Sequence, residues 1–198
     1  LAETLEGCRN VEVIFDDIMK WSAAQIEEKA GGCFKVVANL PYYITTPVLF
    51  RLLECKKLLS ATVMVQKEVA ERICACENTP EYGSLSVAVQ LVASASVKRT
   101  VKRTCFTPPP NVDSAIVRID RESRYQYDVR VMDKLVRSAF AMRRKTLVNN
   151  LIGAMGMTRV SAENLLERAG LSPMTRGEAV SVDKFVALAE IICAGDKS

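Results

Sequence analysis

The sequence predicts an α/β domain over residues 1–122 and a small all-helical domain over residues 123–198. In the first part, short β-branched runs alternate with helical patterns, which indicates βαβ units on a mainly parallel sheet covered by helices on both faces. After residue 125 only helical periodicity remains. The net charge of +4 also belongs entirely to the second part, because basic and acidic residues are equal in number up to residue 122.

Strand and helix signals alternate through the first part. Ser22 is the predicted N-cap of one helix, and Thr46 that of another, which has Pro47 at its first position. We expect strands over residues 11–15, 34–38, 61–66, 96–101 and 114–119. We expect helices over residues 23–30, 47–53, 67–76 and 84–92, and a stiff proline loop at 108–110.

The second part contains three predicted helices, near residues 129–152, 160–169 and 181–193. The first has an apolar face that Arg143 and Arg144 interrupt, three and four positions after Phe140. Two guanidinium groups in such a stripe are not expected to face a dry core. The sequence leaves two alternatives open for them, namely interdomain salt bridges and contact with RNA phosphates.

Composition excludes several kinds of chemistry. With 49% apolar and 25% charged residues, the chain has the composition of a globular protein. It contains no histidine, which excludes Ser-His-Asp and Cys-His catalysis and His-ligated metal sites. The seven cysteines include no CxxC pair, so we expect reduced thiols, no metal site and a cytoplasmic protein. No stretch is long and apolar enough to span a bilayer.

The segment Asn39-Leu40-Pro41-Tyr42 is the strongest candidate for a functional site. It directly follows a predicted strand, and ligands of open α/β sheets bind beyond the carboxyl ends of the strands. Asn39 provides a side-chain acceptor and Tyr42 a flat aromatic face, a combination that suits the exocyclic amine of a planar base. The alternative is an ordinary loop with a partly buried tyrosine.

A second aromatic residue, Phe106, begins a proline-rich segment that ends at Ser114. Two aromatic rings on separate stiff loops can stack on both faces of an extruded base. The alternative is a polyproline turn with Phe106 packed in the core.

Six segments carry a pattern that extends over nearly the whole chain. They are NLPYYITTP at 39–47, QKEVAER at 66–72, YGSLSV at 82–87, FTPPPNVDS at 106–114, FAMRRKTL at 140–147 and RGE at 176–178. As an ordered set they resemble the KsgA/RsmA family of ribosomal RNA adenine N6-dimethyltransferases. The resemblance implies a Rossmann-like methyltransferase sheet followed by a helical domain that contacts RNA and the ribosome. We expect a monomer that binds neither a metal nor a membrane.

The resemblance also implies a reaction. S-adenosylmethionine is the methyl donor, and the substrate is two adjacent adenosines near the 3′ end of small-subunit ribosomal RNA in the immature small subunit. The Asn39 side chain and the backbone carbonyl of Leu40 or Pro41 would accept hydrogen bonds from the target amine. Tyr42 and Phe106 would stack on the adenine. Such a transfer needs alignment more than a strong base, so the lack of histidine is no obstacle.

Two residues are implied for the cofactor. Asp17 follows the predicted strand 11–15 and would accept a hydrogen bond from the amino group of the cofactor's adenine. Asn39 would lie between the cofactor and the target base. Asp16 competes with Asp17 for its role, and a helix-capping aspartate is the alternative reading.

The start of the chain departs from the family pattern. It contains no Gly-rich loop with a GxG and no acidic residue after a second strand, and residues 1–5 resemble the end of the helix that follows that strand. We therefore expect an N-terminally truncated domain that binds S-adenosylmethionine poorly and that is impaired in activity. Calorimetry with the cofactor would measure this, and micromolar binding would contradict it.

Two basic clusters are candidates for RNA contact, because phosphate contacts supply affinity while a base pocket supplies specificity. They are Lys98, Arg99, Lys102 and Arg103 before Phe106, and Arg143, Arg144 and Lys145 on the first predicted C-terminal helix. The alternative is a solvated strand face and a solvated helix face.

Two other functions share part of this pattern. One is an antibiotic-resistance methyltransferase that acts on large-subunit ribosomal RNA, and the other is a non-catalytic RNA-binding assembly factor. The triple proline and the Arg-Arg-Lys segment favour the small-subunit enzyme over the first. Intact Asn39, Tyr42 and Phe106 favour it over the second.

Overall fold

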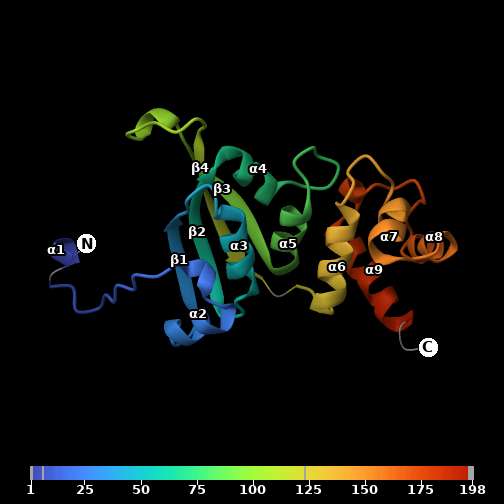
Figure 1. Ribbon diagram of the computed structural model, residues 1–198, viewed down its shortest axis with the longest axis horizontal. Coiled ribbons are helices and arrows are strands. Elements are labelled where there is room, and N and C mark those ends of the chain that lie inside the picture. The colour runs from blue at the N-terminus through green and yellow to red at the C-terminus, as the bar shows by residue number, and fades with distance from the viewer. Residues whose placement is uncertain (1, 6, 123, 196–198) are drawn as a thin grey trace.

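A four-stranded mixed sheet forms the centre of the first part of the molecule (Figure 1). The structure is a computed structural model, and it describes residues 2–5, 7–122 and 124–195. Strands β1 and β2 pair in parallel, whereas β4 is antiparallel to both of its neighbours, β2 and β3. The strands, in their spatial order, are β1 (Phe34–Asn39), β2 (Leu58–Gln66), β4 (Ser114–Arg121) and β3 (Ala93–Val101).

The pairing differs from the mainly parallel sheet that the sequence predicts. Residues 102–113 join β3 to β4 as a hairpin whose one helical piece is the three-residue η2 (Arg103–Cys105), whereas a parallel pair would need a crossover, usually a full α-helix, between the two strands. Each of these four strands was expected, and each extends beyond its predicted range.

Helices cover one face of the sheet, so the prediction of helices on both faces is wrong for the described residues. Helices α3 (Thr45–Glu54), α4 (Lys67–Cys74) and α5 (Ser84–Val92) pack on one another and on the strands (Figure 1). On the other face, Val37 is 85% exposed. In line with it across the strands, Arg118 hydrogen-bonds to Thr62, which is the behaviour of a wet surface.

The strand predicted over residues 11–15 is absent. These residues have no regular secondary structure, and Phe15 is fully exposed. A strand needs a neighbour to pair with its backbone N–H and C=O groups, and the described residues provide none here. Helix α1 (Ala2–Leu5) agrees with the helix end predicted over 1–5, although Leu1 lies outside the described residues.

Helix starts follow the predicted caps in part. Helix α2 (Ala23–Ala30) begins at Ser22, which forms a capping box with Gln25 as its partner. The prediction of Thr46 as a cap is wrong, because the helix begins at Thr45, two residues earlier than predicted, with Ile44 in the cap position and no side-chain cap bond.

The second part is a cluster of helices: α6 (Val129–Ala139), α7 (Leu147–Met155), α8 (Arg159–Arg168) and α9 (Val182–Gly195). The single helix predicted over 129–152 is broken at 140–146. Thr146 caps α7, and the buried Asn150 amide donates to the carbonyl oxygens of Ala139 and Met142, which fixes the turn. Within the described part of the chain, no helix is long and apolar enough to cross a membrane.

The helical part shares its core with the α/β part. Tyr82, from the loop before α5, is buried among the second-part helices, and its hydroxyl donates to the Val180 carbonyl at 2.9 Å. Its ring meets the edge of Phe140 at 5.9 Å between centroids, and burial raises the pKa of its hydroxyl. The predicted boundary adjoins residue 123, which lies outside the described residues, as do residues 196–198.

Gly177 provides a test of the packing inside the helical part. A Cβ at Gly177 would lie 2.4 Å from the carbonyl oxygen of Ala139. We expect Gly177→Ala to lower the free energy of unfolding by about 1–3 kcal/mol through overpacking. The control, Gly153→Ala, lies in α7 with its nearest neighbour at 4.0 Å and should gain about 1 kcal/mol. Urea unfolding measures both, and equal stability of Gly177→Ala and the unmodified chain would contradict the packing.

Candidate functional site

Asn39 ends β1 at the carboxyl edge of the sheet, beside Met64 of β2. The backbone continues by donating the Leu40 N–H to the Met64 carbonyl at 3.2 Å. The Asn39 side chain is exposed and forms no hydrogen bond with any described residue. Its carboxamide is therefore free to bind a ligand.

The turn after Asn39 distinguishes the two backbone acceptors that the sequence left open. The Pro41 carbonyl accepts from Ile44 N–H at 3.1 Å and from Thr45 Oγ1 at 3.0 Å, which uses both of its lone pairs. The Leu40 carbonyl accepts no hydrogen bond from the residues that the structure describes. Leu40 is thus the better acceptor for a ligand amine, and Pro41 shapes the turn.

Tyr42 is fixed by a residue from the other candidate segment. Its hydroxyl lies 2.7 Å from Oγ of Ser114, the fully buried first residue of β4. The Tyr42 ring is half-buried, whereas its neighbour Tyr43 is 85% exposed. The structure therefore brings together the two segments that the sequence singled out, 72 residues apart.

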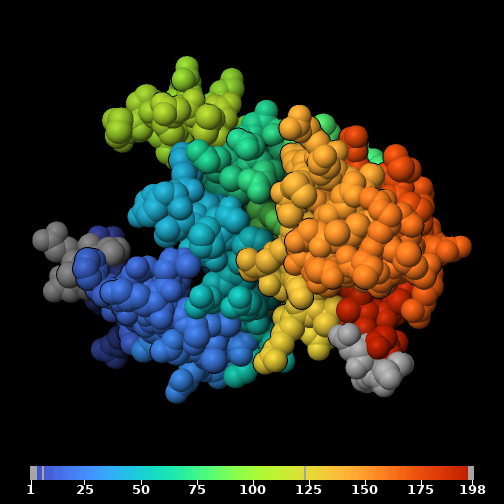
Figure 2. All heavy atoms as spheres, turned by 45° about the vertical axis from the view of Figure 1, so that its right-hand side comes forward, coloured from blue at the N-terminus to red at the C-terminus, as the bar shows by residue number. Residues whose placement is uncertain are grey.

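Phe106 lies on the β3–β4 loop, which projects beyond the sheet (Figure 1). In Figure 2 this lime-green loop projects at the upper left, above the light-blue atoms that it touches. Phe106 is half-buried, and no ring contact joins it to Tyr42 within the described residues. Its stacking role remains a prediction.

Asp16 and Asp17 differ in how far their carboxylates are occupied. Asp16 accepts from Trp21 Nε1 at 2.8 Å and from the Asp17 N–H at 2.7 Å, and the bond from Trp21 is the main reason that its pKa is lowered. Asp17 caps the short helix η1 (Ile18–Lys20) by accepting the Met19 N–H with one oxygen. Asp17 therefore does act as a cap, and its second oxygen has no partner among the described residues.

The basic cluster before Phe106 is exposed. A bulge in β3 falls at Lys98, where the register shifts between Val97 and Arg99. None of these basic side chains pairs with a carboxylate within the described residues. They are Lys98, Arg99, Lys102 and Arg103.

The second basic cluster lies in the turn between α6 and α7 and not on a helix. Arg143 of the helical part donates to the Pro80 carbonyl of the α/β part, whereas the carboxylate that lies 4.0 Å away, that of Glu178, belongs to the helical part itself. The contact between the two parts is thus a hydrogen bond to the backbone, and among the described residues Arg143 does not form the predicted interdomain salt bridge. Arg144 and Lys145 are exposed and form no ion pair in the part of the chain that the structure describes.

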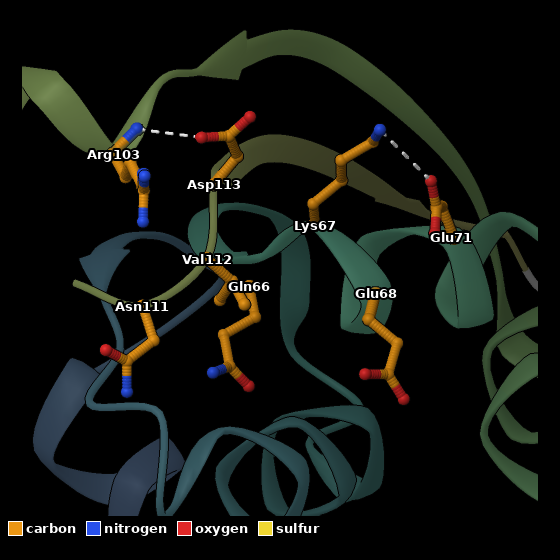
Figure 3. Close-up of a pocket in the computed structure, with 8 residues that line it drawn as sticks. All are labelled: Gln66, Lys67, Glu68, Glu71, Arg103, Asn111, Val112 and Asp113. Carbon is orange, nitrogen blue, oxygen red and sulfur yellow. Dashed lines mark hydrogen bonds and ion pairs between the residues drawn. The ribbon is translucent and has the colours of Figure 1, made fainter.

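Sequence reasoning missed a recess of about 430 Å³ between the start of α4 and the end of the β3–β4 loop. Gln66 and Asn111 line it, together with charged groups (Figure 3). These residues come from segments whose contact no local pattern indicates. The nearest signal is that Gln66, like Asn39, ends a strand at the carboxyl edge of the sheet.

Cysteine and carboxylate side chains form no metal site here. All seven cysteines carry free thiols. Among residues 2–5, 7–122 and 124–195, no group of three or more cysteine and carboxylate side chains is placed to hold a metal ion.

Comparison with known proteins decides the family. The profile described as "Ribosomal RNA adenine dimethylase" matches residues 1–193. The chain belongs to the ribosomal RNA adenine dimethylase family. The resemblance that the motifs carry is thereby confirmed.

Curated relatives agree with this membership in the dimethylase family. "Ribosomal RNA small subunit methyltransferase A" of Streptococcus pneumoniae strain P1031 is 46% identical over 202 residues, which are 97% of this chain and 70% of the relative. The protein of the same name from strain CGSP14 is 47% identical over 204 residues, with the same shares covered.

Solved structures confirm the Rossmann-like methyltransferase fold with helices at its C-terminal side. A dimethyladenosine transferase from Plasmodium falciparum is 26% identical with a TM-score of 0.80, over 98% of this chain and 76% of that one. The 23S rRNA methyltransferase ErmE is 25% identical with a TM-score of 0.65, over 96% and 75%. Of these two structures, the dimethyladenosine transferase is the more similar to this chain.

The bond between Tyr42 and Ser114 can be tested by removing one hydroxyl. Tyr42→Phe leaves the buried Ser114 hydroxyl without this partner, so we expect a loss of about 1–3 kcal/mol in the free energy of unfolding. Tyr43→Phe is the matched control and should change stability by less than about 0.5 kcal/mol. Equal unfolding midpoints for the two variants in urea would show that the bond does not stabilise the fold.

Proposed function

We propose that this chain transfers methyl groups from S-adenosylmethionine to N6 of two adjacent adenosines near the 3′ end of small-subunit ribosomal RNA. One observation carries the proposal. Asn39 and Leu40 present two unused acceptors at the carboxyl end of β1, beside the Tyr42 ring that Ser114 fixes. The named relatives are small-subunit rRNA methyltransferases.

The site acts on the target base by holding its amine. An N6 amine has two N–H donors, and the Asn39 Oδ1 and the Leu40 carbonyl are the two acceptors. Accepting both hydrogens orients the amine nitrogen toward the methyl donor and increases its electron density. Tyr42 stacks on the adenine face and limits its tilt. Alignment of this kind contributes to rate without a proton-shuttling side chain.

Asp17 and Asn39, the two residues implied for the cofactor, have the free acceptor groups that it needs. The second carboxylate oxygen of Asp17 is an exposed acceptor that suits an adenine amino group, and η1 packs against α3, just behind the turn after β1. Asn39 is the residue that borders both ligands. When bound, S-adenosylmethionine supplies an electrophilic methyl group.

RNA contact completes the proposal. We assign residues 1–122 to methyl transfer and residues 123–198 to RNA and ribosome contact. The β3–β4 cluster, with Lys98, Arg99, Lys102 and Arg103, lies on the strand and loop that lead to Phe106 and would bind phosphates near the target base. Arg144 and Lys145 would bind phosphates from the helical part, while Arg143 is held by Pro80 and Glu178.

Asn39→Ala tests the catalytic assignment. With labelled S-adenosylmethionine and undermethylated small subunits, we expect methyl transfer to fall at least about a hundredfold, because the amine loses its orienting acceptor. Asn164→Ala, an exposed asparagine on α8, is the control. Mapping the modified bases identifies the substrate. An unchanged rate in Asn39→Ala contradicts the assignment. Subunit binding without methyl transfer, in a chain that calorimetry shows to bind S-adenosylmethionine, indicates an assembly factor.

Charge reversal tests the RNA contact of the helical part. For Arg144→Glu combined with Lys145→Glu, we expect weaker subunit binding and a salt dependence whose slope falls by roughly 2, one for each lost phosphate contact. Stability should be unchanged, because neither side chain has an ionic partner among the described residues. The control is Lys56→Glu with Lys57→Glu. These two exposed lysines precede β2, at the end of the sheet away from Asn39. Identical salt slopes in the two double variants would exclude the contact.

A further inference from the structure

The recess lined by Gln66 and Asn111 adjoins the residue that holds Tyr42. Gln66, the last residue of β2, is paired with Ser114, and Ser114 holds the Tyr42 hydroxyl. Asn39 and Gln66 thus end two neighbouring parallel strands, and their side chains emerge on the same face of the sheet, because Asn39 is paired with Met64, two residues before Gln66.

The walls of the recess are held in place by backbone contacts. The Asp113 carbonyl accepts the Lys67 N–H at 3.0 Å, and its carboxylate accepts the Arg103 N–H at 2.9 Å. One residue therefore ties the end of the β3–β4 loop to the start of α4. Lys67 also pairs with Glu71 at 3.7 Å, and its ammonium group points away from the side chains of Gln66 and Asn111 (Figure 3).

Three unused polar side chains remain in the recess. Figure 3 shows the carboxamides of Asn111 and Gln66 and the carboxylate of Glu68 turned to the same side. None of the three side chains hydrogen-bonds to a described residue. A carboxamide has a donor and an acceptor side by side, which matches the N7 and N6 edge of adenine, and a carboxylate is a further acceptor for an amine.

We propose that this recess binds the base next to the adenosine being methylated, and that Gln66 and Asn111 recognise the 6-amino group of that base. The inference rests on the proposed function, and it assigns a second base site that selects for an adenine neighbour. From the strand spacing and rise, the Cα atoms of Asn39 and Gln66 are roughly 8 Å apart.

Binding of short RNA to the chain tests this without cofactor or turnover. The probes are single-stranded RNAs with two adjacent adenosines, and the same RNAs with purine riboside, which lacks the 6-amino group, at one or the other position. Affinity is measured by fluorescence anisotropy at fixed salt. We expect each replacement to weaken binding about tenfold in the unmodified chain. Gln66→Ala should remove that cost at one position, and Asn39→Ala should remove it at the other.

Controls separate this inference from the proposed function. Asn111→Ala, in an exposed loop, should act at the same position as Gln66→Ala, and Gln126→Ala, an exposed glutamine before α6, should have no effect. If Gln66→Ala and Asn111→Ala keep both costs while Asn39→Ala removes one, the second base site is wrong and the proposed function stands. If the unmodified chain binds all the RNAs equally, the second base site and the contact of Asn39 with the target amine are both wrong.

Discussion

The hydrogen bond between Tyr42 and Ser114 connects every part of the candidate site. It joins the turn after β1 to the first residue of β4, 72 residues later. On one side of it lie the free acceptors of Asn39 and Leu40, and on the other Gln66 and the recess. Since Ser114 is fully buried, the Tyr42 ring is positioned by the sheet and not by the β3–β4 loop. The same bond therefore fixes the stacking surface and its distance from both groups of polar side chains.

The local chemistry of the turn gives each residue of the Asn-Leu-Pro-Tyr segment a different task. Pro41 has a saturated carbonyl, so it contributes shape and no ligand contact. Leu40 is buried by its side chain yet leaves its carbonyl free, which lets one residue anchor the turn and face a ligand. Since the Tyr42 hydroxyl is bonded to Ser114, Asn39 is the polar side chain of these four described residues that is left to bind a base amine.

Local pattern predicted what depends on neighbours in sequence. The Ser22 cap and strands β1 to β4 were expected because capping and β-branched runs act over a few residues. Residues 11–15 show where this fails, since apolar alternation carries no information on whether a partner strand exists. The break at 140–146 depends on the Asn150 amide, and the partner of Arg143 on Pro80, contacts that join distant segments. The recess was missed for the same reason, because Gln66 and Asn111 meet only through pairing of β2 with β4.

The shared core around Tyr82 fixes how the candidate site and the basic turn of the helical part are placed relative to each other. Tyr82 of the first part is enclosed by helices of the second part, and its hydroxyl donates to the Val180 carbonyl. A buried ring and a buried hydrogen bond both oppose rotation of one part against the other. The distance from Arg144 and Lys145 to Asn39 is then fixed by the packing between the two parts. Under the proposed function, an RNA that contacts both Asn39 and these two basic side chains must match that separation.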